Sequence, residues 1–321
     1  MCRLVPFLLV SAAIFVATSG ASAETLRVCA QAGEACTHIS LARALRQAKD
    51  GMTIVIEPGT YGDAGTLTAS RVTIQATGAR VEGEANQNKA ALVITGRDTT
   101  IIGLECSQVA VPDGNGACIR QEGANLTLRN VNFHHNQVAV MAMAGSGRVV
   151  IEDSVIESNG NKGAPNLYAA GASLELRRTK VLHASGEAHE VKSLAARTTI
   201  EDCVIASLDA VDSRLIDLPS GGEVTIRNSV LQKGKKNANP DVIGFGLPGA
   251  THKTNALTLV GNTIIIDNPK GARLVHTGTN PPQVTMTGNT VIGGKKPEGD
   301  DSTWFPDRQA AGYPAFPLLK K

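Results

Sequence analysis

Short segments that alternate apolar and polar residues recur along most of this chain. Each copy has a central apolar residue, and successive central residues lie 23 to 33 positions apart. They are Ile74, Ile101, Leu128, Ile151, Leu176, Ile200, Ile226, Leu259 and Met286. Strict alternation indicates β-strands rather than helices, and a repeat in this range is typical of a stacked solenoid. The pattern therefore predicts an array of similar β-coils.

Most copies continue through a small polar pair into a second apolar–polar–apolar segment, as Asp153-Ser154 does before Val155. Glycine, asparagine and serine at these positions allow tight corners between strands. One such unit cannot bury its own apolar face, so neighbouring units must stack into a continuous core. The spaced leucines of leucine-rich repeats are absent, and β-propeller blades would be longer and richer in aromatic residues than the 3% found here. A β-sandwich would not repeat one motif nine times. We predict an all-β fold, a right-handed parallel β-helix.

The two ends of the chain differ from the repeat and define its organisation. We expect a signal peptide over residues 1–23, an N-terminal cap over 24–62, coils over 63–293 and an irregular C-terminal cap over 294–321. The N-terminal cap should contain a short amphipathic helix within Thr37–Lys49 that covers the open end of the coil and blocks edge-to-edge pairing. One side of that helix carries Ile39, Leu41, Ala42, Leu45 and Ala48. Four aromatic residues of the tail (Trp304, Phe305, Tyr313 and Phe316) favour a cap over the other end, with a sugar-binding platform as the alternative.

Residues 1–23 have the features of a secretory signal: Arg3, an apolar run and the small residues Ala21-Ser22-Ala23. The apolar run is too short to cross a bilayer, so we expect no membrane insertion and a secreted or periplasmic protein. Without this segment the formal charge is +1, which gives no whole-molecule attraction for nucleic acid.

Five cysteines remain after this segment. Their spacing favours disulfides between Cys29 and Cys36 and between Cys106 and Cys118, because export permits oxidation. Cys203 lies inside a strand repeat and should be a buried, inert thiol. A zinc site is disfavoured, because no His or Cys cluster with ligand spacing accompanies these residues.

A row of polar residues precedes the central apolar positions by a fixed distance. Arg120, Tyr168 and Lys192 each lie eight positions before a central residue, and Asp217 lies nine positions before the next. Ile119, Leu167, Val191 and Ile216 should point into the core, so their neighbours should point outward. Stacked coils lie about 4.8 Å apart, so these four side chains should form one outer column. We expect Asn166 and Glu190 beside it, His189 and Arg214 at its edge, and a gap near Ala142 that a sugar ring could enter.

Such a column suits β-elimination on a uronate-containing polymer. The reaction needs a cation for the uronate carboxylate, a base for the neighbouring proton and an acid for the departing oxygen. We assign catalytic roles to Lys192, His189, Tyr168 and Arg214, with Lys192 or His189 as the base and Tyr168 as the acid. Arg120 or Arg214 would hold the carboxylate, and we assign substrate binding to Arg120, Asn166, Glu190 and Asp217. A lysine base must first lose its proton; neighbouring arginines favour this and Glu190 opposes it, so His189 remains the rival base.

Several segments resemble exported bacterial proteins of the pectin-lyase-like, right-handed β-helix superfamily. They are Gly116-Ala-Cys-Ile-Arg-Gln-Glu-Gly-Ala-Asn-Leu-Thr-Leu, Phe133-His-His-Asn-Gln, His189-Glu-Val-Lys-Ser and Ser213-Arg-Leu-Ile-Asp-Leu-Pro-Ser-Gly-Gly222. The resemblance implies a groove on the outer wall that binds carbohydrate, with lyase, hydrolase or epimerase activity, and a Gram-negative periplasm or the medium as the location. This chain departs from such relatives at Pro165 and Leu194, where they tend to carry histidine and arginine. It also lacks the aspartate motifs of polygalacturonases and the acidic calcium cluster of pectate lyases.

The leading hypothesis is a monomeric polysaccharide lyase whose partner is an acidic polysaccharide. We assign no cofactor and no metal ligand, although calcium remains open. The first alternative is a non-catalytic carbohydrate-binding or envelope-structural β-helix, motivated by the missing histidine and arginine. The second is a glycoside hydrolase, which would use a carboxylate pair among Asp209, Asp212 and Asp217.

Overall fold

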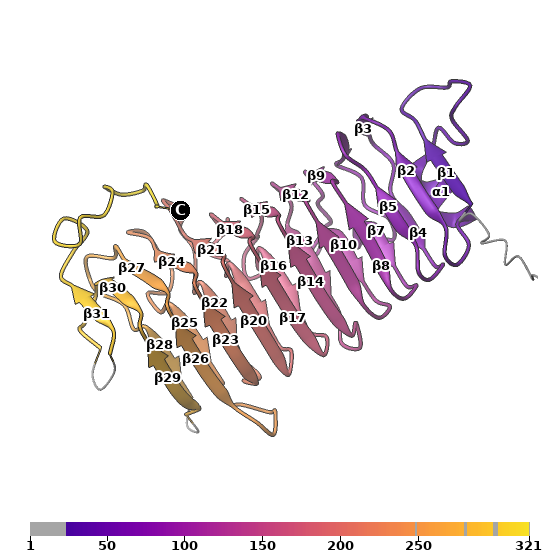
Figure 1. The fold of residues 1–321 in the computed structure, drawn as a ribbon. Coiled ribbons are helices and arrows are strands. Elements are labelled where there is room, and N and C mark those ends of the chain that lie inside the picture. Colours follow the sequence, from indigo (N-terminus) through magenta and orange to yellow (C-terminus); the bar gives the residue numbers. More distant parts are fainter. Residues whose placement is uncertain (1–23, 248, 279–280, 298–300, 321) are drawn as a thin grey trace, which may run out of the picture.

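The computed structural model describes residues 24–247, 249–278, 281–297 and 301–320, and the predicted signal peptide lies outside them. The described chain winds through three parallel sheets in the repeating order A, B, C (Figure 1). Sheet A contains β1 (Thr25–Val28), β2 (Thr53–Ile56), β5 (Thr73–Gln75), β8 (Thr99–Ile102), β11 (Leu126–Arg129), β14 (Arg148–Glu152), β17 (Ser173–Arg177), β20 (Arg197–Glu201), β23 (Glu223–Arg227), β26 (Ala256–Val260) and β29 (Gln283–Thr287). Sheet B contains β3 (Gly59–Tyr61), β6 (Ala79–Glu82), β9 (Glu105–Ser107), β12 (Asn132–His134), β15 (Val155–Glu157), β18 (Lys180–Leu182), β21 (Val204–Ala206), β24 (Val230–Lys233), β27 (Thr263–Ile266), β30 (Thr290–Gly293) and β31 (Thr303–Phe305). Sheet C contains β4 (Gly65–Leu67), β7 (Ala90–Ile94), β10 (Ala117–Gln121), β13 (Val138–Ala142), β16 (Leu167–Ala169), β19 (Val191–Ser193), β22 (Ile216–Leu218), β25 (Ile243–Phe245) and β28 (Val275–Thr277). The predicted parallel β-helix is confirmed.

The register of sheet A follows the repeat in the sequence. Ile74 pairs with Ile101, Ile101 with Leu128, and the series continues without a slip to the pair of Leu259 and Met286. All the predicted central residues before Met286 are fully buried, and Met286 is partly exposed near the last coil. A register slip of one residue would turn every apolar side chain outward, so burial fixes the stacking.

The small polar pairs form the corners between sheets A and B. The first residue of the pair adopts a left-handed conformation, with φ of 51° at Asp153, 51° at Asn228 and 63° at Gly261. Asparagine, aspartate and glycine tolerate this region best. The second residue turns inward and bonds to the coil before it: Ser154 Oγ accepts from the Val131 backbone N–H at 3.1 Å. The pairs therefore make the turn and satisfy backbone groups buried inside it.

The N-terminal end carries a shorter helix than the sequence pattern predicts. Helix α1 spans Leu41–Gln47, and Ser40 caps it by accepting a hydrogen bond from the backbone N–H of Arg43. Leu41, Ala44 and Leu45 are its buried residues, whereas Ile39 precedes the cap and is 66% exposed. The helix begins only after Ser40, so the expectation that Ile39 lies on its buried side is wrong.

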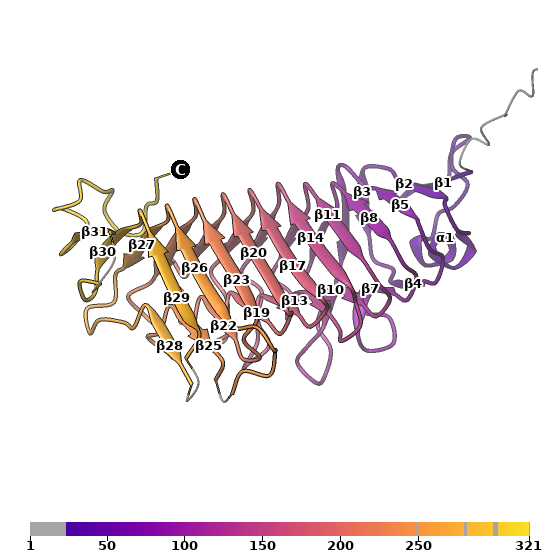
Figure 2. The ribbon, with the colours of Figure 1, turned by 60° about the horizontal axis from the view of Figure 1, so that its bottom comes forward.

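The C-terminal segment is less irregular than expected. Strand β31 adds to sheet B beside β30, and Val291 pairs with Trp304 (Figure 2). Arg308 then holds the tail against the last coils by donating from Nε and Nη2 to the two carboxylate oxygens of Asp267, at 2.6 and 2.7 Å. In the described part of the chain, no helix has the length and apolar character needed to cross a membrane.

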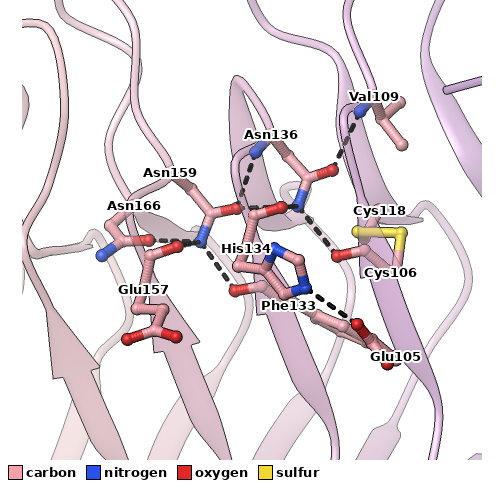
Figure 3. The surroundings of a disulfide bond; sticks show 10 residues. All are labelled: Glu105, Cys106, Val109, Cys118, Phe133, His134, Asn136, Glu157, Asn159 and Asn166. Atoms are coloured by element: carbon pink, nitrogen blue, oxygen red, sulfur yellow. Dashed lines mark hydrogen bonds and ion pairs between the residues drawn. A yellow bond between two sulfur atoms is a disulfide. The ribbon is translucent and has the colours of Figure 1, made fainter. Parts of the chain in front are cut away.

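Both predicted disulfides are present, and Cys203 is a buried free thiol. The bond between Cys106 and Cys118 joins β9 of sheet B to β10 of sheet C (Figure 3). It therefore closes one coil and ends on the strand that carries Arg120.

Candidate functional site

The predicted column exists on the outer face of sheet C. In successive coils Arg120 pairs with Met141, Met141 with Tyr168, Tyr168 with Lys192, and Lys192 with Asp217. The residue before each predicted member of the column is fully buried, as predicted. These residues are Ile119, Leu167, Val191 and Ile216. The coil between Arg120 and Tyr168 is not an open gap, because Met141 fills the column there and is only 9% exposed.

A pocket of about 500 Å³ lies over the middle of the column. Its floor is formed by Met141, Tyr168 and Lys192, and its wall by two loops, Pro112 to Asn115 and Asn161 to Pro165. The loops contact each other, since Asn161 Nδ2 donates to the Gly114 carbonyl oxygen at 3.4 Å. An aromatic ring, an apolar thioether and an ammonium group on one floor suit a sugar ring that carries an acidic group.

Asp217 is the centre of the charged part of the column. Its side chain is 6% exposed, and Arg214 Nη1 donates to Oδ1 at 3.0 Å. Its Oδ2 lies 3.8 Å from Lys192 Nζ and 3.5 Å from His189 Nε2. Lys192 is held beside Asp217, but its side chain is 30% exposed and also lines the pocket.

His189 lies beneath this group and is nearly buried. Burial lowers its pKa to about 4, an effect that the positive charges of Lys192 and Arg214 reinforce and the negative charge of Asp217 opposes. The imidazole is therefore neutral at neutral pH. Its Nδ1 accepts the backbone N–H of Arg214 at 3.2 Å, which occupies the lone pair that a base would use. This geometry leaves His189 poorly placed to accept a proton from a ligand in the pocket, whereas Lys192 lines the pocket directly.

Arg120 stands apart from the Asp217 group, three coils from Lys192 and four from Asp217 along the column. Its Nε donates to Glu122 at 2.9 Å and its Nη1 contacts Met141 Sδ at 3.2 Å. Lys89 Nζ also donates to Glu122, at 2.8 Å. Arg120 is thus part of a separate charged group at the N-terminal side of the pocket.

Asn166 and Glu190 do not flank the column as expected, because both are fully buried inside the coil. Each lies at the corner before its strand, where alternation does not apply. Asn159 Nδ2 donates to Asn166 Oδ1 at 2.7 Å, and Asn159 Oδ1 accepts from Asn136 Nδ2 at 2.7 Å (Figure 3). Asn166 Nδ2 then donates to Glu190 Oε2 at 2.9 Å. These residues, which we call the interior amide row, hold the corner in shape and do not face a ligand.

The interior amide row ends in a buried ionisable group, of which the sequence analysis named Glu190 and Asp212 in other roles and missed Lys233. Lys233 Nζ donates to Asp212 Oδ1 at 2.8 Å, and both side chains are fully buried. Burial, reinforced by the nearby charge of Asp212, raises the pKa of Glu190 to about 8. Burial also raises the pKa of Asp212 and lowers that of Lys233.

Four further residues missed by the sequence analysis lie at the C-terminal end of the column. Gly244 pairs with Asp217, and His276 pairs with Gly244. Asp241 is fully buried and binds Arg273 Nε at 2.8 Å and His276 Nδ1 at 2.6 Å. His276 lies ten residues before Met286, not eight or nine, so the fixed spacing did not reveal it. In the described ranges, no three His, Cys, Asp or Glu side chains are grouped as a metal site would require.

Known proteins share this architecture. A family model described as right handed beta helix region matches residues 60–291. The structure is similar to that of pectate lyase Pel9A, with a TM-score of 0.65 and 15% identity over 88% of this chain and 80% of the other. It is also similar to an alginate lyase from Paenibacillus sp. str. FPU-7, with a TM-score of 0.57 and 17% identity over 88% and 98%. A pectin methylesterase bound to a hexasaccharide gives a TM-score of 0.51 and 12% identity over 90% and 95%. No curated protein sequence matches the chain.

Proposed function

Because this chain belongs to the right-handed β-helix family, we propose that it is a carbohydrate-active enzyme that cleaves a uronate-containing polysaccharide by β-elimination over sheet C. One observation carries the proposal: Tyr168 and Lys192 are register neighbours on adjacent coils and form the floor of the same pocket. A base and an acid on adjacent coils, about 4.8 Å apart, can serve adjacent atoms of one sugar linkage. The pectate lyase and the alginate lyase that share the fold are named for polymers of this class, which supports a uronate-containing substrate.

Each side chain of the site has one role in this reaction. Lys192, in its neutral form, takes the proton from the ring carbon next to the uronate carboxylate. The electron pair of that C–H bond forms a ring double bond and expels the glycosidic oxygen, which takes a proton from Tyr168. Arg214 stabilises the negative charge that develops on the carboxylate. Asp217 contacts His189, Lys192 and Arg214, and neither Asp217 nor His189 lines the pocket, so these two residues position Lys192 and Arg214.

The pairing of charges along the column favours binding without catalysis as the second candidate. Asp217 already contacts Arg214 and Lys192, and Glu122 already contacts Arg120 and Lys89. A glycoside hydrolase is less well supported. Asp212 is buried against Lys233, and Asp209 lies 3.2 Å from His183 Nε2 instead of joining the column.

Export of the chain is part of the proposal. Two disulfides in one domain fit an oxidising compartment, since disulfides are rare where thiols are kept reduced. An extracellular or periplasmic location would also bring the column into contact with polysaccharide.

The test is an assay for the ultraviolet absorbance of the unsaturated product, with pectate and alginate among the substrates. Lys192→Ala and Tyr168→Phe should each lower the rate by about 100-fold or more, the usual contribution of a general base or acid. Lys180→Ala is the matched control, because Lys180 is exposed on β18 of sheet B. Absence of product with every acidic polymer, together with binding of one of them, would replace the lyase by the binding-only function. Full activity in Lys192→Ala would refute the assignment of the base.

A further inference from the structure

The C-terminal half of the column contains a second charged group, built around Asp241. This carboxylate is fully buried, and its Oδ1 accepts from Arg273 Nε at 2.8 Å. Its Oδ2 lies 2.6 Å from His276 Nδ1 and 3.5 Å from Arg214 Nε. Burial acts to raise the pKa of Asp241, but the hydrogen bonds and positive charges of Arg273 and His276 outweigh burial and lower it. Asp241 is therefore an ionised anchor that fixes the positions of three side chains.

The anchored side chains keep donors that no described residue uses. Arg273 is 60% exposed, and its hydrogen bonds run from Nε and Nη2 to Asp241, leaving Nη1 without an acceptor in the described ranges. Arg214 donates from Nη1 to Asp217, and its Nη2 has no acceptor among these residues. Arg273 presents its free edge outward, because it is 60% exposed, whereas Arg214 is only 18% exposed.

Gly244 makes this arrangement possible on the floor of the column. A Cβ atom at Gly244 would lie 2.5 Å from Cδ and 2.7 Å from Nε of Arg214. The Arg214 side chain therefore lies directly over this strand, in the space that a side chain at position 244 would occupy. Without that space Arg214 could not contact Asp217 and Asp241 together.

The positive charge of this group is the part that faces solvent. Asp241 is fully buried, whereas the Arg273 guanidinium that it anchors is 60% exposed. An anion that approaches the column here meets a preorganised donor and a positive charge whose counter-ion lies beneath it.

We propose that Arg273, anchored on Asp241, forms a subsite that binds the carboxylate of a sugar unit beyond the cleaved linkage, while Arg214 stays with the reacting sugar. The coil of Arg273 lies three coil spacings, or roughly 14 Å, beyond that of Lys192 along the column. This inference rests on the proposed function for the identity of the polymer as an acidic polysaccharide. It assigns a role in substrate length and charge selection to Arg273, with Asp241, His276 and Gly244 as positioning residues.

The experiment measures binding of oligogalacturonate and of its methyl ester by calorimetry, with oligomers of alginate as a second acidic probe. Arg273→Gln should weaken binding of the best acidic oligomer by about tenfold or more, because the variant loses a charge-assisted hydrogen bond to the carboxylate. Binding of the uncharged methyl ester should not change. Arg197→Gln is the matched control, because Arg197 is 68% exposed and pairs with Glu223 on sheet A, away from this group.

The outcomes separate the subsite from the lyase hypothesis. Equal affinity of Arg273→Gln and the wild-type protein for every acidic oligomer would overturn the subsite, whether or not the protein cleaves polymers. An equal loss with the acidic oligomer and its methyl ester would also overturn it, because the charge would then not be what is recognised. A selective loss in a protein that produces no unsaturated product would support the subsite and reject the lyase. If the lyase assignment holds, Arg273→Gln should raise KM on long substrates and leave kcat close to the wild-type value.

Discussion

Replacing Glu190 by glutamine should make the stability of the protein less dependent on pH. Glu190 is fully buried, and its two oxygens accept hydrogen bonds from the Ala184 backbone N–H and from Asn166 Nδ2, at 2.7 and 2.9 Å. Burial raises its pKa to about 8 from 4.5. The folded protein therefore holds this proton more tightly than the unfolded chain does.

The sign and size of the effect follow from that difference. The stabilising contribution is complete below about pH 4.5 and is lost as the pH rises through about 8. Each tenfold change in proton affinity corresponds to about 1.4 kcal/mol, so ionisation of Glu190 should cost the fold about 5 kcal/mol at high pH. Glutamine keeps the size and polarity of the protonated side chain and cannot ionise, so the variant should escape this loss.

Urea denaturation of the wild-type protein and of Glu190→Gln, at pH 5, 7 and 9, measures the effect. The difference in unfolding free energy between variant and wild type should shift by several kcal/mol in favour of the variant between pH 5 and pH 9. Glu187→Gln is the matched control, because Glu187 is exposed in the same coil and its replacement should leave the pH dependence unchanged. Parallel pH profiles for the wild-type protein and Glu190→Gln would refute the reasoning, since they would mean that Glu190 titrates alike in the folded and unfolded chains.

Two further predictions concern the interior of the coils. Asn159→Ala should destabilise the fold by about 3 kcal/mol or more, because Asn159 Nδ2 donates to the Phe133 carbonyl and to Asn166, and each buried group left unpaired costs about 1–3 kcal/mol; a denaturation midpoint equal to that of the wild type would contradict this. Cys203 should not react with a thiol reagent in the folded protein at pH 8, because burial raises its pKa to about 11; labelling at the rate of the urea-unfolded chain would show that the thiol is accessible.

The stacking of the coils could be predicted from the sequence because it depends on local pattern alone. Period-2 alternation sets which side chains of a strand point inward, and the spacing between Ile74 and Met286 sets which strands pair. The corners could also be predicted from local pattern, because residues such as Asp153 and Gly261 tolerate the left-handed backbone conformation that a corner needs. The disulfide between Cys106 and Cys118 also follows from positions close in sequence that fall within one coil.

The site was only partly predictable, and the limits have a physical cause. Alternation correctly placed Tyr168, Lys192 and Asp217 in one column, because all three lie inside strands. It failed for Asn166 and Glu190, which lie at corners where the backbone turns and the side chain points into the coil. The sequence by itself therefore determined the fold, the register and the strand-borne half of the column.

Only the tertiary structure decided which charges meet. Arg214, Asp241 and Arg273 come from three successive coils and lie up to 59 residues apart in the sequence, yet they share one buried carboxylate. The 33-residue spacing between Ile226 and Leu259 contains a longer loop, which removes the fixed offset that aligned the earlier coils. Side chains that approach each other across coils obey packing and charge rather than a spacing rule, so neither the neutral state of His189 nor the group around Asp241 could be inferred before the coils were stacked.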